Sequence, residues 1–136
     1  MATYTKGISI KLTKNFKSAE LDCKGKKCCS KTMIDIELVG YLQVIRNYFG
    51  KAVTINSGYR CQKHNKNIGG EKNSRHTQGM AADIVVKGVT PIKVAQFAEM
   101  IGIRGIGLYD NFVHIDTRSD KFYWKGHAQK AVKTFK

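Results

Sequence analysis

The sequence has no run of about 18 or more apolar residues, the length that a membrane-spanning helix needs. Its first residues, Met1–Lys6, also lack the apolar core of a secretory signal peptide. We therefore expect a soluble protein that is made in the cytoplasm and makes no use of a membrane. Internal repeats and low-complexity stretches are absent as well. With 42% hydrophobic residues to fill a core, residues 1–136 are expected to form one domain and to act as a monomer.

Acidic residues are scarce, because 10 Asp and Glu stand against 24 Lys and Arg, a formal net charge of +14. Such a surface attracts polyanions, of which nucleic acid is the usual one. The basic residues are spread along the chain, with clusters at 24–27, 63–66 and 121–136, and no recognised nucleic-acid motif accompanies them. We therefore expect no nucleic acid as partner, although a nucleic-acid binder remains an alternative.

The chain also lacks a CxxC pair. Its cysteines are Cys23, Cys28, Cys29 and Cys61, which allow three full disulfide pairings that the sequence cannot rank. Without an export signal the expected state is reduced, partly buried thiols, and later oxidation outside the cell is an alternative. A second zinc site made by the four cysteines is a further alternative, which the absence of a CxxC spacing disfavours.

Two histidines and a carboxylate offer a metal site. His76 and Asp83 lie seven positions apart, and His114 follows in the segment 112–116. Three protein ligands leave the fourth corner of a tetrahedral zinc open for water, which is typical of a catalytic site. In a strand over 112–116, alternation would turn His114 and Asp116 to one face while Val113 and Ile115 enter the core.

These segments resemble the zinc D-Ala-D-Ala carboxypeptidase family, the M15 peptidases, whose members cut peptidoglycan stem peptides. Residues 74–83 match the family pattern SxHxxGxAxD, residues 57–60 look like its SGYR, and residues 112–116 look like its closing strand. The similarity runs over roughly residues 50 to 118. It implies an α+β fold, with a small antiparallel sheet and helices packed to one side, as in the DD-peptidases and the hedgehog domain.

The resemblance implies a zinc-dependent peptidoglycan peptidase, either a D,D-carboxypeptidase or an endopeptidase, with zinc held by His76, Asp83 and His114. The missing export signal favours a phage endolysin that reaches the cell wall during lysis. Peptidoglycan is the expected partner, and anionic wall polymers would suit the basic surface. The alternative is a non-catalytic, zinc-stabilised wall-binding module, since the hedgehog domain uses the same fold for binding.

The general base departs from the family pattern. Relatives place an acidic residue three positions before the last histidine ligand, where this chain has Asn111. We expect Asp116 to be the base because it shares the strand face of His114, with Asp110 as second choice. The alternative role for Asp116 is to orient His114.

Three further residues are expected to serve the substrate. Arg60, from the SGYR segment, would stabilise the oxyanion, or else form a salt bridge with an acid. Ser74 would bind substrate or cap the turn that carries His76. Tyr109 would line the groove, although aromatic residues at such places are more often core.

Local patterns predict the main elements. A helix should follow Asp35 and end at Gly50, and a second should start at Thr90 and Pro91 and stop at Gly102. A short helix is expected over 62–66. Strands are expected over 52–55, 105–109, 112–116 and 122–124, with a hairpin turn at 110–111.

Overall fold

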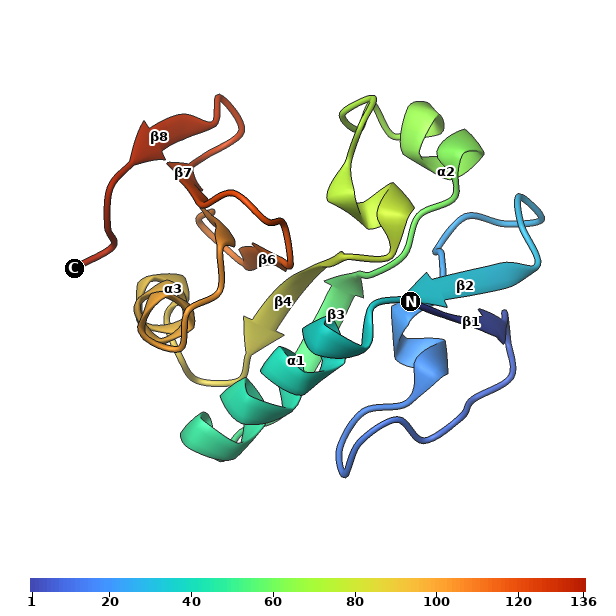
Figure 1. Ribbon diagram of the computed structural model, residues 1–136, viewed down its shortest axis with the longest axis horizontal. Coiled ribbons are helices and arrows are strands. Elements are labelled where there is room, and N and C mark those ends of the chain that lie inside the picture. Colours follow the sequence, from blue (N-terminus) through green and yellow to red (C-terminus); the bar gives the residue numbers. More distant parts are fainter.

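The computed structural model describes residues 1–136, which form an α+β fold (Figure 1). The larger sheet has six strands, in the spatial order β3 (Val53–Ser57), β4 (Ala81–Val86), β6 (Val113–Asp116), β5 (Gly105–Leu108), β7 (Phe122–Lys125) and β8 (Lys130–Val132). A smaller sheet pairs β1 (Ala2–Thr5) with β2 (Lys31–Ile34). The helices are α1 (Ile36–Phe49), α2 (Gln62–Asn67) and α3 (Pro91–Met100), with the 3-10 turns η1 (Ser18–Leu21) and η2 (Arg75–Gln78).

The larger sheet is mixed, whereas an antiparallel sheet was predicted. Its strand pairs are antiparallel except for β5 and β7, which run parallel. The reason lies in the connections. A hairpin places β6 along one edge of β5, and the link over 117–121 then reverses direction and carries the chain to the other edge of β5. The strand predicted over 122–124 is confirmed, but its direction follows from this crossover.

The two longer helices begin and end where the sequence predicts. The Asp35 side chain accepts a hydrogen bond from the Glu37 amide at 3.0 Å, and Gly50 closes α1 with a φ of 62°. Helix α3 starts with Pro91 in its first turn, although the Thr90 side chain makes no capping hydrogen bond. Capping groups satisfy the free amides of a first turn, and a left-handed glycine lets the chain leave the last one.

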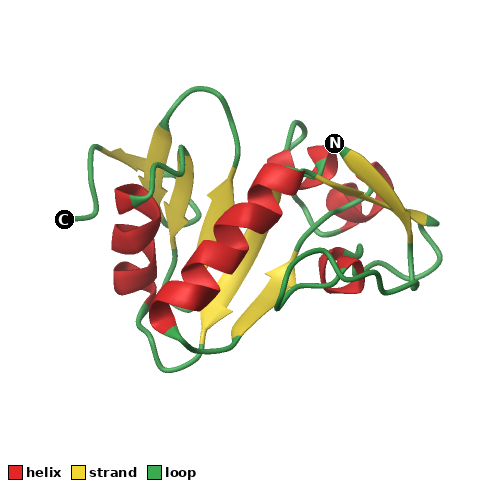
Figure 2. Cartoon of the chain, turned by 60° about the horizontal axis from the view of Figure 1, so that its bottom comes forward, coloured by secondary structure: helices red, strands yellow, loops and turns green.

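Both helices pack on one face of the larger sheet, as predicted (Figure 2). Alternate residues of the central strands point into this core, among them Ile84 of β4 and Ile115 of β6, which are almost completely buried. Each such side chain contributes about 1.5–3 kcal/mol by leaving water. A slip of one residue would turn every side chain to the other face, so this burial fixes the strand register. The polar residues of the same strands are thereby held on the opposite face.

The N-terminal part of the chain contains elements that were not predicted. Strands β1 and β2 are short, lie far apart in sequence and pair only with each other. At the other end of the chain, strand β8 was not predicted either; it is shorter still and pairs with the edge of β7. Because β1 and β2 each depend on a partner distant in the chain, local alternation gives little sign of them.

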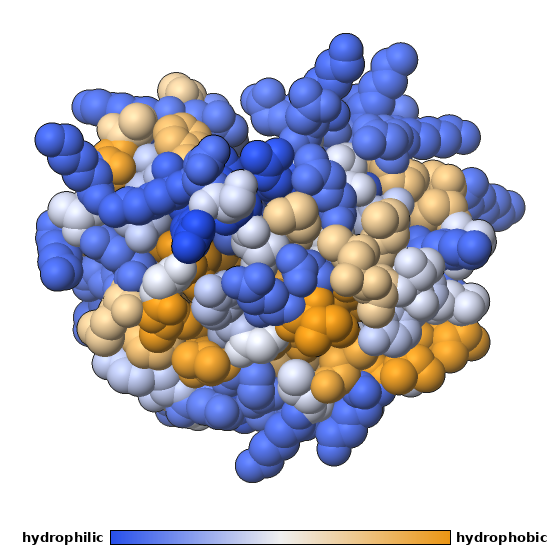
Figure 3. Space-filling view, in the orientation of Figure 1, coloured by the Kyte–Doolittle hydropathy of each residue, from blue (hydrophilic) through white to orange (hydrophobic).

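The surface is dominated by hydrophilic side chains. Many of them project from the rim of the face drawn in Figure 3, while apolar side chains gather over its lower part. The helices are too short or too polar to cross a lipid bilayer.

Candidate active site

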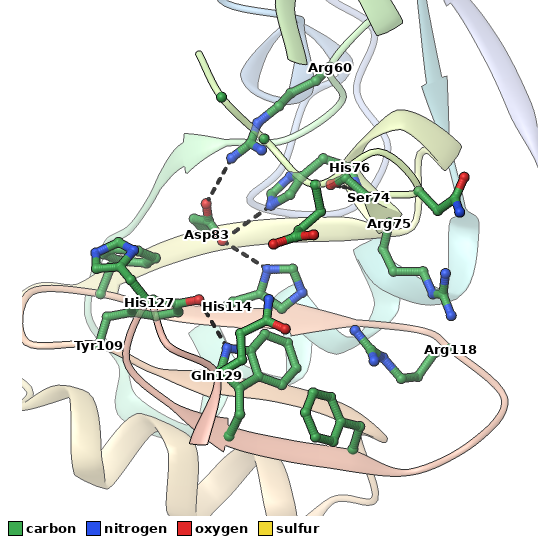
Figure 4. A pocket seen from close by; sticks show the side chains of 17 residues that line it. Arg60, Ser74, Arg75, His76, Asp83, Tyr109, His114, Arg118, His127 and Gln129 are labelled. Carbon is green, nitrogen blue, oxygen red and sulfur yellow. Dashed lines mark hydrogen bonds and ion pairs between the residues drawn. The ribbon is translucent and has the colours of Figure 1, made fainter. Parts of the chain in front are cut away.

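A cavity of about 450 Å³ lies over the polar side of β4 and β6 (Figure 4). Its lining comes from the loop after β3, the loop before η2, η2 itself, the strands β4, β6 and β7, the turn between β5 and β6, the link between β6 and β7, and the turn after β7. The lining residues are Arg60, Gly69, Gly70, Glu71, Asn73, Ser74, Arg75, His76, Asp83, Tyr109, Phe112, His114, Arg118, Phe122, Trp124, His127 and Gln129. The lining is mostly polar, which suits a polar substrate.

The three residues expected to bind a metal converge in this cavity. His76 Nε2 lies 3.3 Å and His114 Nδ1 lies 3.0 Å from the same oxygen, Asp83 Oδ1. All three ligand atoms lie within 4.8 Å of one another. A tetrahedral zinc with bonds near 2.0–2.1 Å separates its ligand atoms by about 3.3 Å. The donor set and its spacing therefore fit zinc.

Strand pairing brings two of these ligands together. In the register of β4 and β6, Asp83 lies directly opposite His114. His76 comes from η2, where Ser74 Oγ accepts a hydrogen bond from the His76 amide at 3.2 Å. Gly79 ends this turn with a φ of 73°, and a Cβ there would lie 2.6 Å from the Met33 carbonyl oxygen. Position 79 thus needs glycine for both its conformation and its close contact with β2.

Each histidine is also held at its second ring nitrogen. His76 Nδ1 donates to the Gly58 carbonyl at 2.7 Å, so its proton is on Nδ1 and the Nε2 lone pair faces Asp83. His114 Nε2 lies 2.7 Å from Asp116 Oδ2, which leaves Nδ1 for the metal. Such outer hydrogen bonds fix the tautomer and the ring orientation of metal-binding histidines.

Asp116 occupies a setting unlike that expected of a general base. Its side chain is completely buried and does not line the cavity. Arg118 donates to it from Nε at 2.8 Å and from the terminal nitrogen at 2.7 Å. Burial raises the pKa of Asp116, but hydrogen bonds from Arg118 and His114 outweigh it and hold the pKa well below its usual range. A carboxylate so fully paired is suited to orienting His114.

Replacement of Asp116 by asparagine separates the two roles. If Asp116 orients His114, the substitution should weaken zinc binding by roughly 10- to 100-fold, and saturating zinc should restore turnover. A general base would behave differently, because turnover would stay low at saturating zinc. Zinc titration of the variant, followed by turnover measurements at each concentration, distinguishes the outcomes.

Gly105 makes room for this buried carboxylate. It lies opposite Asp116 in the β5–β6 pair, and a Cβ at this position would overlap the carboxylate. Two residues on, Gly107 similarly faces the Trp124 indole. The alternating glycines at 105 and 107 are therefore a sequence signal for large side chains packed against β5.

Arg60 is tied to Asp83, one of the three converging side chains that could hold a metal. Its terminal nitrogen lies 3.3 Å from Asp83 Oδ2, and its Nε donates to Ser57 Oγ at 2.9 Å. This is the salt bridge that the sequence left open as the alternative. The guanidinium also lines the cavity, so its charge faces both the ligand and the space for substrate.

Glu71 lines the cavity, although the sequence did not indicate it as a site residue. Besides Asp83, it is the only carboxylate in the lining. The buried Asn65 holds its loop, because Asn65 Nδ2 donates to the Glu71 carbonyl at 2.8 Å while Arg60 donates to Asn65 Oδ1 at 3.3 Å. Glu71 comes shortly before the SxHxxGxAxD segment, but no local sequence pattern predicts its place in the cavity lining.

Ser74 and Tyr109 both line the cavity. The Ser74 hydroxyl caps η2, the simpler of its two expected roles. Tyr109 stacks on Phe112 at 4.4 Å between ring centroids and accepts a hydrogen bond from Trp124 Nε1 at 2.9 Å. Tyr109 and Phe112 together form an aromatic wall of the cavity. Asp110, the second candidate for the base, lies outside this cavity.

The electrostatics of the metal-free site favour a charged His114. Burial lowers its pKa, but hydrogen bonds to Asp116 and Asp83 raise the pKa of His114 to about 9. Burial lowers the pKa of His76, which is neutral at pH 7. Burial acts to raise the pKa of Asp83, yet the hydrogen bond and the positive charge of His114 hold that pKa below its usual range. The proton on His114 thus supplies the positive charge that faces the carboxylates of Asp83 and Asp116 when no metal is bound.

This proton makes the stability of the metal-free protein depend on pH. Because the pKa of His114 is about 9 in the fold against 6.5 in the unfolded chain, its stabilisation is complete below about pH 6.5. It should be lost as the pH rises through 9, at a cost on the order of 3 kcal/mol. Thermal unfolding of the metal-free protein between pH 6 and 10, compared with the His114→Gln variant, measures the difference; equal slopes would contradict the prediction.

Comparison with known proteins agrees with this site. The model of the family described as Peptidase M15 matches residues 14–116, more than half of the chain. The probable peptidoglycan L,D-endopeptidase MepK of Haemophilus influenzae is 40% identical over 76 residues, 51% of this chain and 40% of that protein. The zinc D-Ala-D-Ala carboxypeptidase of Streptomyces albus G is 41% identical over 78 residues, 52% of this chain and 31% of that protein.

A third relative, the peptidoglycan L,D-endopeptidase MepK of Escherichia coli K12, is 34% identical over 93 residues, 62% of this chain and 51% of that protein. The chain therefore spans about a third to a half of the length of these relatives. The range that the family model matches includes His76, Asp83 and His114, the three residues that converge on one point in the cavity. The chain belongs to the M15 peptidase family.

Proposed function

We propose that this protein is a zinc-dependent peptidase that cuts peptide bonds in bacterial peptidoglycan. The convergence of His76 Nε2, Asp83 Oδ1 and His114 Nδ1 at zinc spacing carries the proposal. Family membership and the peptidoglycan activities in the names of the relatives support it. The DD-peptidase type of fold shared with the hedgehog domain is part of the same proposal.

Zinc, when bound, would supply Lewis-acid activation of water and of the scissile carbonyl at neutral pH. The residues of the chain divide the remaining tasks. Glu71, the free carboxylate of the cavity, takes the proton from water and passes it to the leaving amine. Arg60 holds Asp83 in place and presents positive charge where the oxyanion develops. Asp116 holds His114 through its Nε2 atom.

The substrate lies in the cavity between a polar rim and an aromatic wall. Tyr109, Phe112 and Trp124 form the wall, which offers apolar contact to alanine methyl groups and stem-peptide backbone. Ser74 and Arg75 on the opposite side offer a hydroxyl and a positive charge to peptide carbonyls and carboxylates. These contacts favour a short, polar peptide.

The decisive experiment is digestion of purified peptidoglycan by the zinc-loaded protein, with the released fragments weighed by mass spectrometry. Release of free D-alanine would indicate a D,D-carboxypeptidase, and separated stem peptides an endopeptidase. A zinc-loaded, folded protein that releases nothing from several wall types would contradict the proposed function. Action on intact walls after release from a host would fit the role of a phage endolysin.

A non-catalytic wall-binding module is the second candidate. The observation that favours it is Asn111, which stands where well-known relatives carry an acidic residue. Binding to peptidoglycan without released fragments would support this candidate. Glu71 in the cavity favours the enzyme.

The net charge of +14 should strengthen adhesion to anionic wall polymers. Because salt screens charges beyond about 8 Å at physiological ionic strength, adhesion should weaken as salt rises. Cosedimentation of the protein with intact walls at increasing salt measures this effect. Adhesion that does not change with salt would show that a specific pocket, and not the basic surface, holds the wall.

A further inference from the structure

The four cysteines form a compact cluster, and none of them lines the cavity. Cys23, Cys28 and Cys29 come from the loop between η1 and β2, and Cys61 precedes α2. The four sulfur atoms lie within 4.8 Å of one another, and none is in a disulfide. The tertiary structure therefore gathers every cysteine of the chain at one point.

The spacing of the sulfur atoms is that of a tetrahedral metal site. Sγ of Cys23 lies 3.7 Å from that of Cys28 and 3.9 Å from that of Cys61, and the sulfurs of Cys28 and Cys29 are 3.9 Å apart. Four thiolates around zinc with bonds near 2.3 Å are separated by about 3.8 Å. Disulfide sulfurs lie about 2.05 Å apart.

The backbone is shaped around this cluster. Lys27, just before the paired cysteines, has a φ of 53°, a left-handed conformation that a lysine seldom adopts. It turns the chain back so that Cys28 meets Cys23. Gly25 lies so close that a Cβ there would be 2.5 Å from Cys28 Sγ. A loop folded this tightly around four sulfurs needs an attraction that neutral thiols supply only weakly.

Hydrogen-bond donors lie beside three of the four sulfur atoms. Amides donate to two of the sulfurs, from Cys61 to Cys23 Sγ at 3.5 Å and from His64 to Cys61 Sγ at 3.4 Å. The ammonium of Lys6 lies 3.9 Å from Cys29 Sγ. Four thiolates with one Zn²⁺ carry a formal charge of about −2, which these donors and the lysines at 24–27 would balance.

We propose that Cys23, Cys28, Cys29 and Cys61 bind a second, structural zinc ion, separate from the metal site of the cavity. The thiolate donors and the tetrahedral spacing together favour zinc, and four protein ligands leave no open position for a substrate. The sequence has no CxxC spacing, which disfavoured such a site. In the structure the turn at Lys27 and the approach of Cys61 bring the four sulfur atoms together without it.

The position of this site gives it a mechanical role. Cys61 directly follows Arg60, which holds Asp83, and Gly58 of the same segment holds His76 Nδ1. A metal at the cluster would tie this segment to the N-terminal loop. The proposal itself does not depend on peptidase activity, since the cluster has its own ligands.

The first test is metal content of the full chain, purified with zinc under reducing conditions and without chelators. We expect about two zinc ions per chain in the wild type and one in the His76→Ala, His114→Ala double variant. One should also be lost in the Cys28→Ser, Cys29→Ser double variant, whereas Ser30→Ala should keep both. Zinc that is unchanged when the cysteines are replaced, or iron at the cluster, would overturn the proposal.

The second test uses only proteins that keep the cysteines, and so holds even if the cysteine variant fails to fold. Cobalt added to the His76→Ala, His114→Ala variant should produce thiolate-to-cobalt charge-transfer absorption. In the zinc-loaded wild type, the thiols should resist alkylation until a chelator is added, with no reductant required. Immediate alkylation would mean free thiols, and alkylation only after reduction would mean disulfides; either result overturns the proposal.

Discussion

Replacement of His114 by alanine is expected to remove the zinc ion of the cavity and reduce peptidoglycan hydrolysis by at least roughly 10³-fold, because a catalytic metal supplies several kcal/mol of transition-state stabilisation. Only two protein ligands, His76 and Asp83, would remain. The variant should still fold, since Asp116 keeps its paired Arg118 and Asp83 keeps Arg60. Zinc content, thermal unfolding and released wall fragments are the measurements.

His127→Ala is the matched control for the loss of an imidazole. His127 lines the same cavity but is not among the three converging donors, so its replacement should leave zinc content unchanged. A folded His114→Ala protein that retained the zinc of the cavity would show that the ligand assignment is wrong.

The second large effect is expected for Glu71→Gln. Glutamine keeps the size and much of the polarity of glutamate but cannot accept a proton, so turnover should fall by roughly 10² to 10⁴-fold while zinc stays bound. Because the buried Asn65 binds the backbone carbonyl of Glu71 and not its side chain, the loop should keep its conformation. Turnover at saturating zinc and substrate, together with zinc content, tests this.

Asp110→Asn is the control, since Asp110 lies outside the cavity and should be replaceable with little loss of turnover. An active Glu71→Gln variant beside an inactive Asp110→Asn variant would show that Asp110, in the hairpin turn, is the base and that Glu71 is not. Were both variants active, a residue such as His127, which also lines the cavity, would have to carry the proton.

The convergence of the candidate metal-binding side chains could be anticipated in part from the sequence, because local patterns carry them. Alternation in the strand over 112–116 turns His114 to one face, and burial of Ile115 on the other face holds that register. Helix α1 was predictable for the same kind of reason, since Asp35 and Gly50 satisfy its ends. The ligand types were also present in the order that the family resemblance implies.

The roles of the acidic residues were decided by the tertiary structure. Strand alternation correctly places Asp116 on the side of His114, but it says nothing about Arg118, which pairs with Asp116 in a space left by Gly105. Glu71 reaches the cavity because buried Asn65 anchors its loop. Whether a carboxylate is paired or free depends on neighbours that only packing supplies.

The sequence by itself determined which side chains are available for chemistry and on which face of a strand or helix each lies, because backbone periodicity is local. Tertiary structure alone decided which of them meet. Cys61 joins a cysteine loop more than thirty positions earlier, and Asp83 meets His114 across a strand pair of similar separation. Closing such long loops is stabilised by the apolar core on the other side of the sheet, so the positions of the polar groups follow from the packing of the apolar ones.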